Sequence, residues 1–219
     1  MARSLFVAVA CLIGCSSTGC SSTDTPADFD QGATQAVVGT TESRLAYPPA
    51  PYGTRPGGVI ENFQFLGWHR PDLSKDPTKL EPVSLAEYYN PDGTKPTRFI
   101  VMTATAVWCS ACKLEYRDLT SKQVADFRSR GVEFIGALFQ DQTSNPAQPS
   151  DLHTWASTYA VSFPFVLDPE LKLGVFFSLE ATPMEMVIDT KTMQILTITD
   201  GWLPGNDPLW SYLDTLLGD

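Results

Sequence analysis

Residues 98–112, RFIVMTATAVWCSAC, decide the fold class of this chain. After its first residue the stretch is apolar or β-branched and carries no charge as far as Ala106, which is typical of a strand buried on both faces. The pattern becomes helical over residues 111–130, and Gly131 stands where a helix C-cap is favoured. The sequence therefore predicts a buried strand that leads through two cysteines into a helix.

The two cysteines occupy different positions relative to that helix. Cys109 falls near its start, where partial positive charge and free N–H groups favour a thiolate, so we expect an exposed, attacking cysteine there. Cys112 lies one turn further in and is expected to be more buried. It is predicted to resolve a mixed disulfide by attacking Cys109 and releasing the reduced partner.

Strand and helix patterns alternate on either side of this stretch. Residues 189–192, Asp-Thr-Lys-Thr, are a hairpin turn signal between two apolar runs. The alternation predicts an α/β fold, a three-layer sandwich around a central sheet. The other expected strands are residues 63–68, 132–139, 163–167, 184–188 and 194–199, and the other expected helices are residues 84–89, 151–159, 169–177 and 207–217.

The first residues have the layout of an export signal. Residues 1–14 contain one charge followed by an apolar run that is too short to span a bilayer, and they end before Cys15 in a sequence that resembles a bacterial lipobox. The resemblance implies a lipidated Cys15 and a flexible tether over residues 15–55, rich in Ser, Thr, Ala and Pro, before a folded domain at residues 56–219. Plain secretion and an uncleaved anchor stay open, and Cys20 is either a second processing site or a passive thiol.

Composition narrows the possible partners. The chain has 15 Lys and Arg against 25 Asp and Glu, a formal charge of −10, which excludes the basic footprint that nucleic-acid binding needs. Its 43% apolar residues are ordinary for a globular domain.

The segment Trp108-Cys109-Ser110-Ala111-Cys112 after an apolar strand resembles the WCxxC site of thioredoxin-like proteins. Ala181-Thr182-Pro183, followed by the apolar run MEMVID, is similar to the place where this family carries a cis-proline beside the redox pair. The resemblance implies a thioredoxin-like α/β/α sandwich with a mixed sheet and an N-terminal extension. It also implies that Trp108, Thr182 and Pro183 contact the substrate.

Two further features resemble particular branches of the family. Glu115, three residues after Cys112 and thus on the same helical face, matches the glutamate of the membrane-tethered TlpA-like branch, where the carboxylate exchanges the proton of the buried cysteine. The long loop from Asp141 to Pro164 is similar to the AhpC/TSA redoxin branch, so a peroxide substrate is an alternative. Peroxidases of this fold carry Thr or Ser three residues before the attacking cysteine, and Ala106 stands there.

Other interpretations of these residues stay open. In the simplest alternatives, the two cysteines form an inert disulfide or half of a zinc site. A zinc site needs two more ligands, and the only histidines in the sequence, His69 and His153, lie far from the cysteines in the chain. Glu115 as a solvated carboxylate and Trp108 as a core residue are the plain alternatives for those positions. We therefore expect no metal and no cofactor.

The resulting hypothesis is an exported, lipid-anchored thiol-disulfide oxidoreductase of the periplasm or cell envelope. Its expected partners are disulfide-containing exported proteins, an electron donor that the sequence does not name, and the membrane that holds the anchor; we expect a monomer. The alternatives are a thiol peroxidase of the redoxin type and a non-catalytic binding module with a static disulfide.

Overall fold

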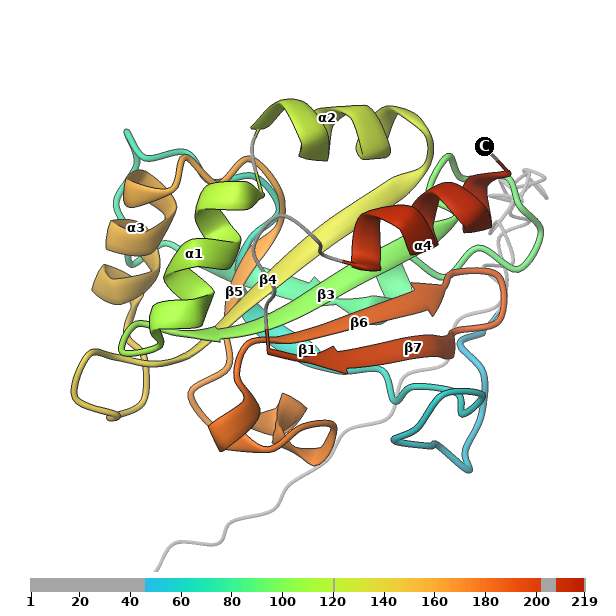
Figure 1. Ribbon diagram of the computed structural model, residues 1–219, viewed down its shortest axis with the longest axis horizontal. Coiled ribbons are helices and arrows are strands. Elements are labelled where there is room, and N and C mark those ends of the chain that lie inside the picture. Colours follow the sequence, from blue (N-terminus) through green and yellow to red (C-terminus); the bar gives the residue numbers. More distant parts are fainter. Residues whose placement is uncertain (1–45, 120, 202–207, 219) are drawn as a thin grey trace, which may run out of the picture. The chain divides into compact units, whose positions relative to one another are not determined.

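The computed structural model describes residues 46–119, 121–201 and 208–218 (Figure 1). The predicted signal peptide, Cys15, Cys20 and most of the predicted tether lie outside these residues. Of the tether, residues 46–55 are described, and the side chain of Tyr47 there donates a hydrogen bond to the Ile60 carbonyl at 2.8 Å and packs against Tyr89.

A seven-stranded mixed sheet forms the centre of the fold, in the order β2-β1-β5-β4-β3-β6-β7. Central strand β3 pairs in parallel with β4 and antiparallel with β6, which confirms the predicted α/β class with a mixed sheet. The strands are β1 Gln64–Trp68, β2 Glu81–Ser84, β3 Phe99–Ala106, β4 Val132–Gln140, β5 Phe165–Leu167, β6 Met184–Asp189 and β7 Gln194–Asp200.

Strand β3 is buried on both of its faces, as its uncharged apolar sequence predicts. Every residue from Ile100 to Ala106 is buried, and both alternating sets of side chains are included. The sheet is therefore a middle layer that the rest of the chain covers on both sides. The α-helices are α1 Ser110–Asp118, α2 Ser121–Ser129, α3 Pro149–Thr158 and α4 Pro208–Leu217, and the short 3₁₀ helices are η1 Leu85–Glu87, η2 Lys172–Val175 and η3 Leu179–Ala181.

The prediction of one helix over residues 111–130 is wrong. Helix α1 ends at Asp118, and Leu119 has φ −66° and ψ 56°, outside the helical region, before α2 begins at Ser121. No proline or glycine marks this break in the sequence, since Leu119 is followed by Thr120 and Ser121.

The helix predicted over residues 169–177 is also wrong. Only Lys172–Val175 is helical, as 3₁₀ helix η2, and the preceding Leu171 has a left-handed φ of 53°. The buried carboxylate of Asp168 starts this turn by accepting the backbone N–H groups of Lys172 and Leu173 at 2.8 and 3.0 Å. The short helix predicted at residues 84–89 is present as a single 3₁₀ turn, η1, and Ser84 is its N-cap.

An aromatic cluster around Tyr116 attaches helix α1 to the sheet. The Tyr116 ring lies 5.4–6.2 Å, centroid to centroid, from four other aromatic rings. Trp155 belongs to α3 and Tyr159 is the residue after it, whereas Phe163 precedes β5 and Phe165 is its first residue. The cluster thus joins α1, α3 and the sheet in one packed layer, and it fixes the position of the helix that carries the two cysteines.

Candidate functional site

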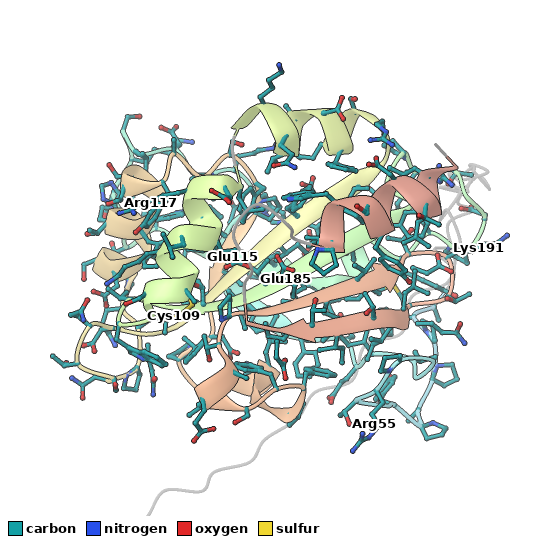
Figure 2. All side chains as sticks on the ribbon, in the orientation of Figure 1. Arg55, Cys109, Glu115, Arg117, Glu185 and Lys191 are labelled. Atoms are coloured by element: carbon teal, nitrogen blue, oxygen red, sulfur yellow. A yellow bond between two sulfur atoms is a disulfide. The ribbon has the colours of Figure 1, made fainter. Side chains whose placement is uncertain are left out.

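The end of strand β3 places the two cysteines. After Ala106 the chain stays tied to strand β4, because the Val107 N–H donates to the Gln140 carbonyl at 2.9 Å. The chain then turns, with the Cys109 N–H donating to the Ala106 carbonyl at 3.1 Å, and Cys109 becomes the N-cap of α1 (Figure 2). Its sulfur accepts the Cys112 N–H at 3.0 Å, so the sulfur of Cys109 caps a free donor at the helix start.

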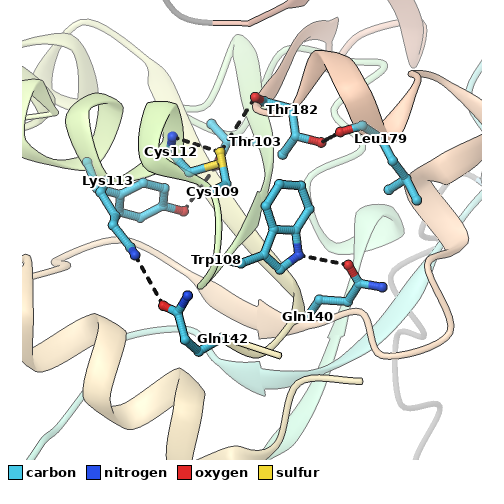
Figure 3. The surroundings of a disulfide bond; sticks show 10 residues. Thr103, Trp108, Cys109, Cys112, Lys113, Gln140, Gln142, Leu179 and Thr182 are labelled. Carbon is cyan, nitrogen blue, oxygen red and sulfur yellow. Dashed lines mark hydrogen bonds between the residues drawn. A yellow bond between two sulfur atoms is a disulfide. The ribbon is translucent and has the colours of Figure 1, made fainter. Parts of the chain in front are cut away.

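Cys109 and Cys112 form a disulfide, with Cα atoms 5.3 Å apart. Cys112 is fully buried, as predicted. The prediction of an exposed Cys109 is wrong for this oxidised form, because only 3% of the residue is exposed. The segment that carries Thr182 covers it, and the Thr182 carbonyl oxygen lies 3.5 Å from the Cys109 sulfur (Figure 3).

The segment with Thr182 is held by its own hydrogen bonds. The Thr182–Pro183 peptide bond is cis. The Thr182 hydroxyl donates to the Leu179 carbonyl at 2.8 Å. The Gly201 N–H, just after strand β7, donates to the carbonyls of Ala181 and Pro183 at 2.8 and 2.7 Å. These bonds place the Thr182 backbone beside the disulfide, where a substrate chain bound to Cys109 would meet it.

Trp108 lies beside the disulfide and also takes part in packing. Its indole N–H donates to the Gln140 side-chain oxygen at 2.9 Å, and its ring meets the Phe139 ring edge-on (Figure 3). The side chain is half-buried. Trp108 is thus next to Cys109 in the chain and is anchored on strand β4.

Helix α1 also carries a buried carboxyl group, that of Glu115, close to the cysteines in the chain. Glu115 is 1% exposed and lies one helical turn after Cys112. The neighbouring Tyr116 is buried, and its hydroxyl lies 3.1 Å from the Thr103 hydroxyl of strand β3. Burial raises the pKa of Tyr116 well above its usual value, and the charge of Glu115 raises it further, against the Thr103 hydrogen bond, which lowers it. The interpretation of Glu115 as a solvated carboxylate is wrong, because the side chain is inside the protein.

Sequence reasoning missed several polar residues of this site. Thr103 and Gln140 sit in apolar strand patterns, and nothing in those patterns shows that they meet Tyr116 and Trp108. Glu185 is a third such residue, a buried acid in strand β6. Only the pairing of the strands shows where these side chains lie.

The two histidines lie apart from the cysteines. His69 pairs with Glu87 at 2.6 Å, and the His153 ring packs against Trp68. Within the described ranges, no three His, Cys, Asp or Glu side chains gather in a way that would hold a metal ion.

A disulfide at the N-terminus of a helix, beside a cis-proline segment and on a mixed sheet, defines a thioredoxin-like protein. The chain belongs to the AhpC/TSA family of redoxins, whose model matches residues 66–195. Family membership and the vicinal cysteine pair identify it as an oxidoreductase. No curated protein matches the chain.

Solved structures share the fold at low sequence identity. A putative thiol:disulfide interchange protein DsbE from Chlorobium tepidum is 13% identical with a TM-score of 0.55, covering 76% of this chain and 99% of that one. A DsbF homologue from Corynebacterium diphtheriae is 17% identical with a TM-score of 0.53, covering 78% and 98%. A putative protein disulfide isomerase from Bacteroides thetaiotaomicron is 16% identical with a TM-score of 0.54, covering 75% and 89%. In the part of the chain that the structure describes, no helix combines the length and apolar character needed to cross a bilayer.

Proposed function

We propose that this chain is an exported, lipid-anchored thiol-disulfide oxidoreductase that reduces or exchanges disulfides of extracytoplasmic proteins. The observation that carries the proposal is the position of the Cys109 sulfur, at the N-terminus of α1 and 3.5 Å from the Thr182 carbonyl oxygen. A sulfur placed there can exchange disulfides with a chain that lies along Thr182. The names of the similar structures, thiol:disulfide interchange proteins among them, support the same chemistry.

The reaction begins from the reduced pair. The helix N-terminus favours the Cys109 thiolate, which attacks a substrate disulfide, forms a mixed disulfide and releases the first substrate thiolate. Cys112 then loses its proton and attacks the Cys109 sulfur, which breaks the mixed disulfide and releases the second thiolate. The substrate gains two electrons, the two thiolates are protonated, and the enzyme is left with the Cys109–Cys112 disulfide.

Three neighbours have proposed roles in this reaction. Glu115 accepts the proton of Cys112, because it lies one turn away on the same helical face and inside the protein. Trp108 and the Thr182-Pro183 segment bind the substrate chain around the mixed disulfide. An electron donor of the dithiol class restores the reduced pair.

The proposed anchor rests on the sequence of the first residues. A lipid on Cys15 would place the domain at a membrane surface with residues 16–55 as a tether. Cys15→Ala should abolish the incorporation of labelled palmitate into the protein, because the residue that would carry the lipid is gone. Equal incorporation of palmitate into the wild-type chain and Cys15→Ala would contradict lipidation at that residue.

The central test compares single cysteine variants of the full chain. Cys109→Ser should abolish the reduction of insulin disulfides in the presence of a reducing agent, because serine cannot form the mixed disulfide. Cys20→Ser is the matched control, since it removes a thiol outside the redox pair, and it should keep wild-type activity. Insulin reduction by Cys109→Ser at the wild-type rate would overturn the mechanism. A Cys109–Cys112 disulfide that no mild reductant can reduce in the wild-type chain would favour the non-catalytic binding module instead.

The direction of electron flow follows from the reduction potential of the pair. Equilibration with glutathione measures it. A value near or below roughly −270 mV, that of thioredoxin, would make the protein a reductant, whereas a value near roughly −120 mV, that of DsbA, would make it an oxidant.

A further inference from the structure

A row of three residues crosses the sheet beneath helix α1. Thr103 in β3 is the register partner of Gly136 in β4 on one side and of Glu185 in β6 on the other. Register partners on neighbouring strands carry their side chains on the same face of a sheet. Glu185 therefore projects on the same side as Thr103, one strand away.

The face in question is the one that carries α1. The Thr103 hydroxyl meets the Tyr116 hydroxyl at 3.1 Å, and a Cβ atom added at Gly136 would collide with that same Tyr116 hydroxyl. Both contacts come from α1, so the row lies under the helix that starts at Cys109. Glu185, only 3% exposed, is thus a carboxyl group buried in the layer between this helix and the sheet.

Glu115 occupies the same layer from the other side. It belongs to α1, is 1% exposed, and is close enough to Tyr116 for its charge to act on the phenol. Figure 2 shows Glu115 and Glu185 between α1 and strand β6. The layer under the active-site helix therefore holds two acids, contributed by α1 and by the strand that follows Pro183.

Two carboxyl groups in one buried region influence each other strongly. A second negative charge is costly where little water screens it, so a pair of carboxyl groups in such a region tends to retain one proton. Through such coupling, a change of charge on Glu185 would change the proton affinity of Glu115.

We propose that Glu185 is a positioning residue of the redox reaction, whose charge sets the pH at which Glu115 is free to accept the proton of Cys112. This inference rests on the proposed function and on the role of Glu115 in it. In this proposal Glu185 acts through Glu115 and not by contact with the substrate.

The step that it controls is the resolution of the mixed disulfide. The Cys112 thiol gives its proton to the Glu115 carboxylate, and the Cys112 sulfur attacks Cys109. The new Cys109–Cys112 bond forms as the bond from Cys109 to the substrate sulfur breaks, and the electron pair leaves with the substrate thiolate. The proton then passes from Glu115 to solvent, which restores the carboxylate.

Other titratable groups among the described residues lie on α1, on β7, which pairs with β6, and on α4. Helix α1 contributes the two cysteines and Tyr116, strand β7 contributes Asp200, and helix α4 contributes Tyr212 and Asp214. Asp214 pairs with Arg130 at 2.9 Å, and burial raises the pKa of Asp200. The test below separates Glu185 from these groups by changing it alone.

The experiment follows the resolving step against pH. The full chain with Cys11→Ser, Cys15→Ser and Cys20→Ser is reduced and mixed with the aromatic disulfide DTNB in a stopped-flow instrument. The first thionitrobenzoate is released when Cys109 attacks, and the second when Cys112 resolves the mixed disulfide. The rate of the second release should fall on the acid side as Glu115 becomes protonated.

The fall in the rate of the second release at low pH is the acid limb of the pH profile. In Glu185→Gln this acid limb should move to lower pH by about one unit or more, a tenfold change in proton affinity. Glu185→Asp keeps the charge and should leave the limb near its wild-type position. Glu115→Gln should lose the limb together with most of the rate. A Glu185→Gln variant that resolves with an unshifted acid limb would overturn the inference, while a wild-type chain that releases no second thionitrobenzoate would overturn the proposed function instead.

If Glu185→Gln does not fold, a second measurement tests the inference in chains that keep Glu185. Carboxyl ¹³C NMR titration of Glu115→Gln and of the parent chain should give Glu185 a lower midpoint in the variant, because the like charge at residue 115 is gone. The same Glu185 midpoint in both chains would also contradict the inference.

Discussion

The Cys109 sulfur and the Thr182 carbonyl oxygen lie 3.5 Å apart, although 73 residues separate them in the chain. The pairing of β6 with β3 brings them together, since β3 ends just before Cys109 and β6 begins just after Pro183. In the proposed reaction, a substrate sulfur bonded to Cys109 would therefore lie near the Thr182 backbone.

This relationship predicts a trapped intermediate in Cys112→Ser. Serine at the buried position cannot resolve the mixed disulfide, so Cys109 should stay covalently attached to its substrate. Non-reducing gel electrophoresis of Cys112→Ser after incubation with a disulfide-containing protein should show a higher-mass species that a reductant removes. The double variant Cys109→Ser/Cys112→Ser is the control, and the same species in that control would show that another thiol had reacted.

Gly136 is predicted to be intolerant of a side chain. A Cβ atom there would overlap the Tyr116 hydroxyl and lie 2.7 Å from the Phe165 ring, so Gly136→Ala should lower the free energy of unfolding by about 1–3 kcal/mol. In the background of Tyr116→Phe, which removes the hydroxyl, the cost of Gly136→Ala should be smaller. Urea unfolding of the four chains in this double-mutant cycle measures the difference, and strictly additive costs would contradict the contact.

The raised pKa of Tyr116 predicts a dependence of stability on alkaline pH. Because the folded-state pKa lies above the unfolded value of about 10, the folded protein keeps the phenol protonated where the unfolded chain ionises. The stabilisation is fully present below pH 10 and is lost as the pH rises above it, by about 1.4 kcal/mol per pH unit until the folded-state pKa is reached. Tyr116→Phe lacks this loss. The free energy of unfolding of both chains, measured between pH 8 and about pH 11, should change in favour of Tyr116→Phe as the pH rises. A difference in free energy between the two chains that stays constant over this range would contradict the prediction.

Peroxide is predicted to be a poor substrate despite membership of the AhpC/TSA family. Ala106, fully buried three residues before Cys109, offers a methyl group where peroxidases of this fold carry a hydroxyl. We expect hydrogen peroxide consumption by the reduced protein to rise linearly with peroxide concentration, at the level of Cys109→Ser. Saturable turnover that disappears in Cys109→Ser would establish the peroxidase instead.

The central strands of the sheet could be predicted from the sequence, because a strand that is buried on both faces is a nearly continuous run of apolar residues. The uncharged run ending at Ala106 and the mostly apolar run at residues 132–139, which contains one charge at Glu133, were each predicted as a buried strand, and both are strands that are buried over most of their length. The edge strand Glu81–Ser84 was missed, since it is short, contains Pro82 and has only one buried residue. The break after Leu119 was missed because no proline or glycine stands there to mark the end of a helix.

In the candidate site, the sequence predicted those residues that belong to a local motif or to a segment that resembles the family. Cys109, Cys112 and Thr182 were found in this way, and the structure brings them together. The burial of Cys109 was not foreseen, because it depends on a segment 73 residues away. Glu185 gave no signal, since one acid in an apolar strand pattern predicts a solvent-facing side chain, and only the pairing with Thr103 reveals that it lies under the active-site helix.

The Gly201 N–H, which donates to the carbonyls on both sides of Thr182, has a consequence for the thermodynamics of substrate capture. A receptor surface that is already ordered loses little conformational entropy when a ligand arrives. If a polypeptide substrate binds there as proposed, most of the ordering falls on that chain, because the sulfur that it has to reach is almost fully covered. Discrimination among substrates would therefore depend on how readily the polypeptide around their disulfide unfolds, more than on its side chains.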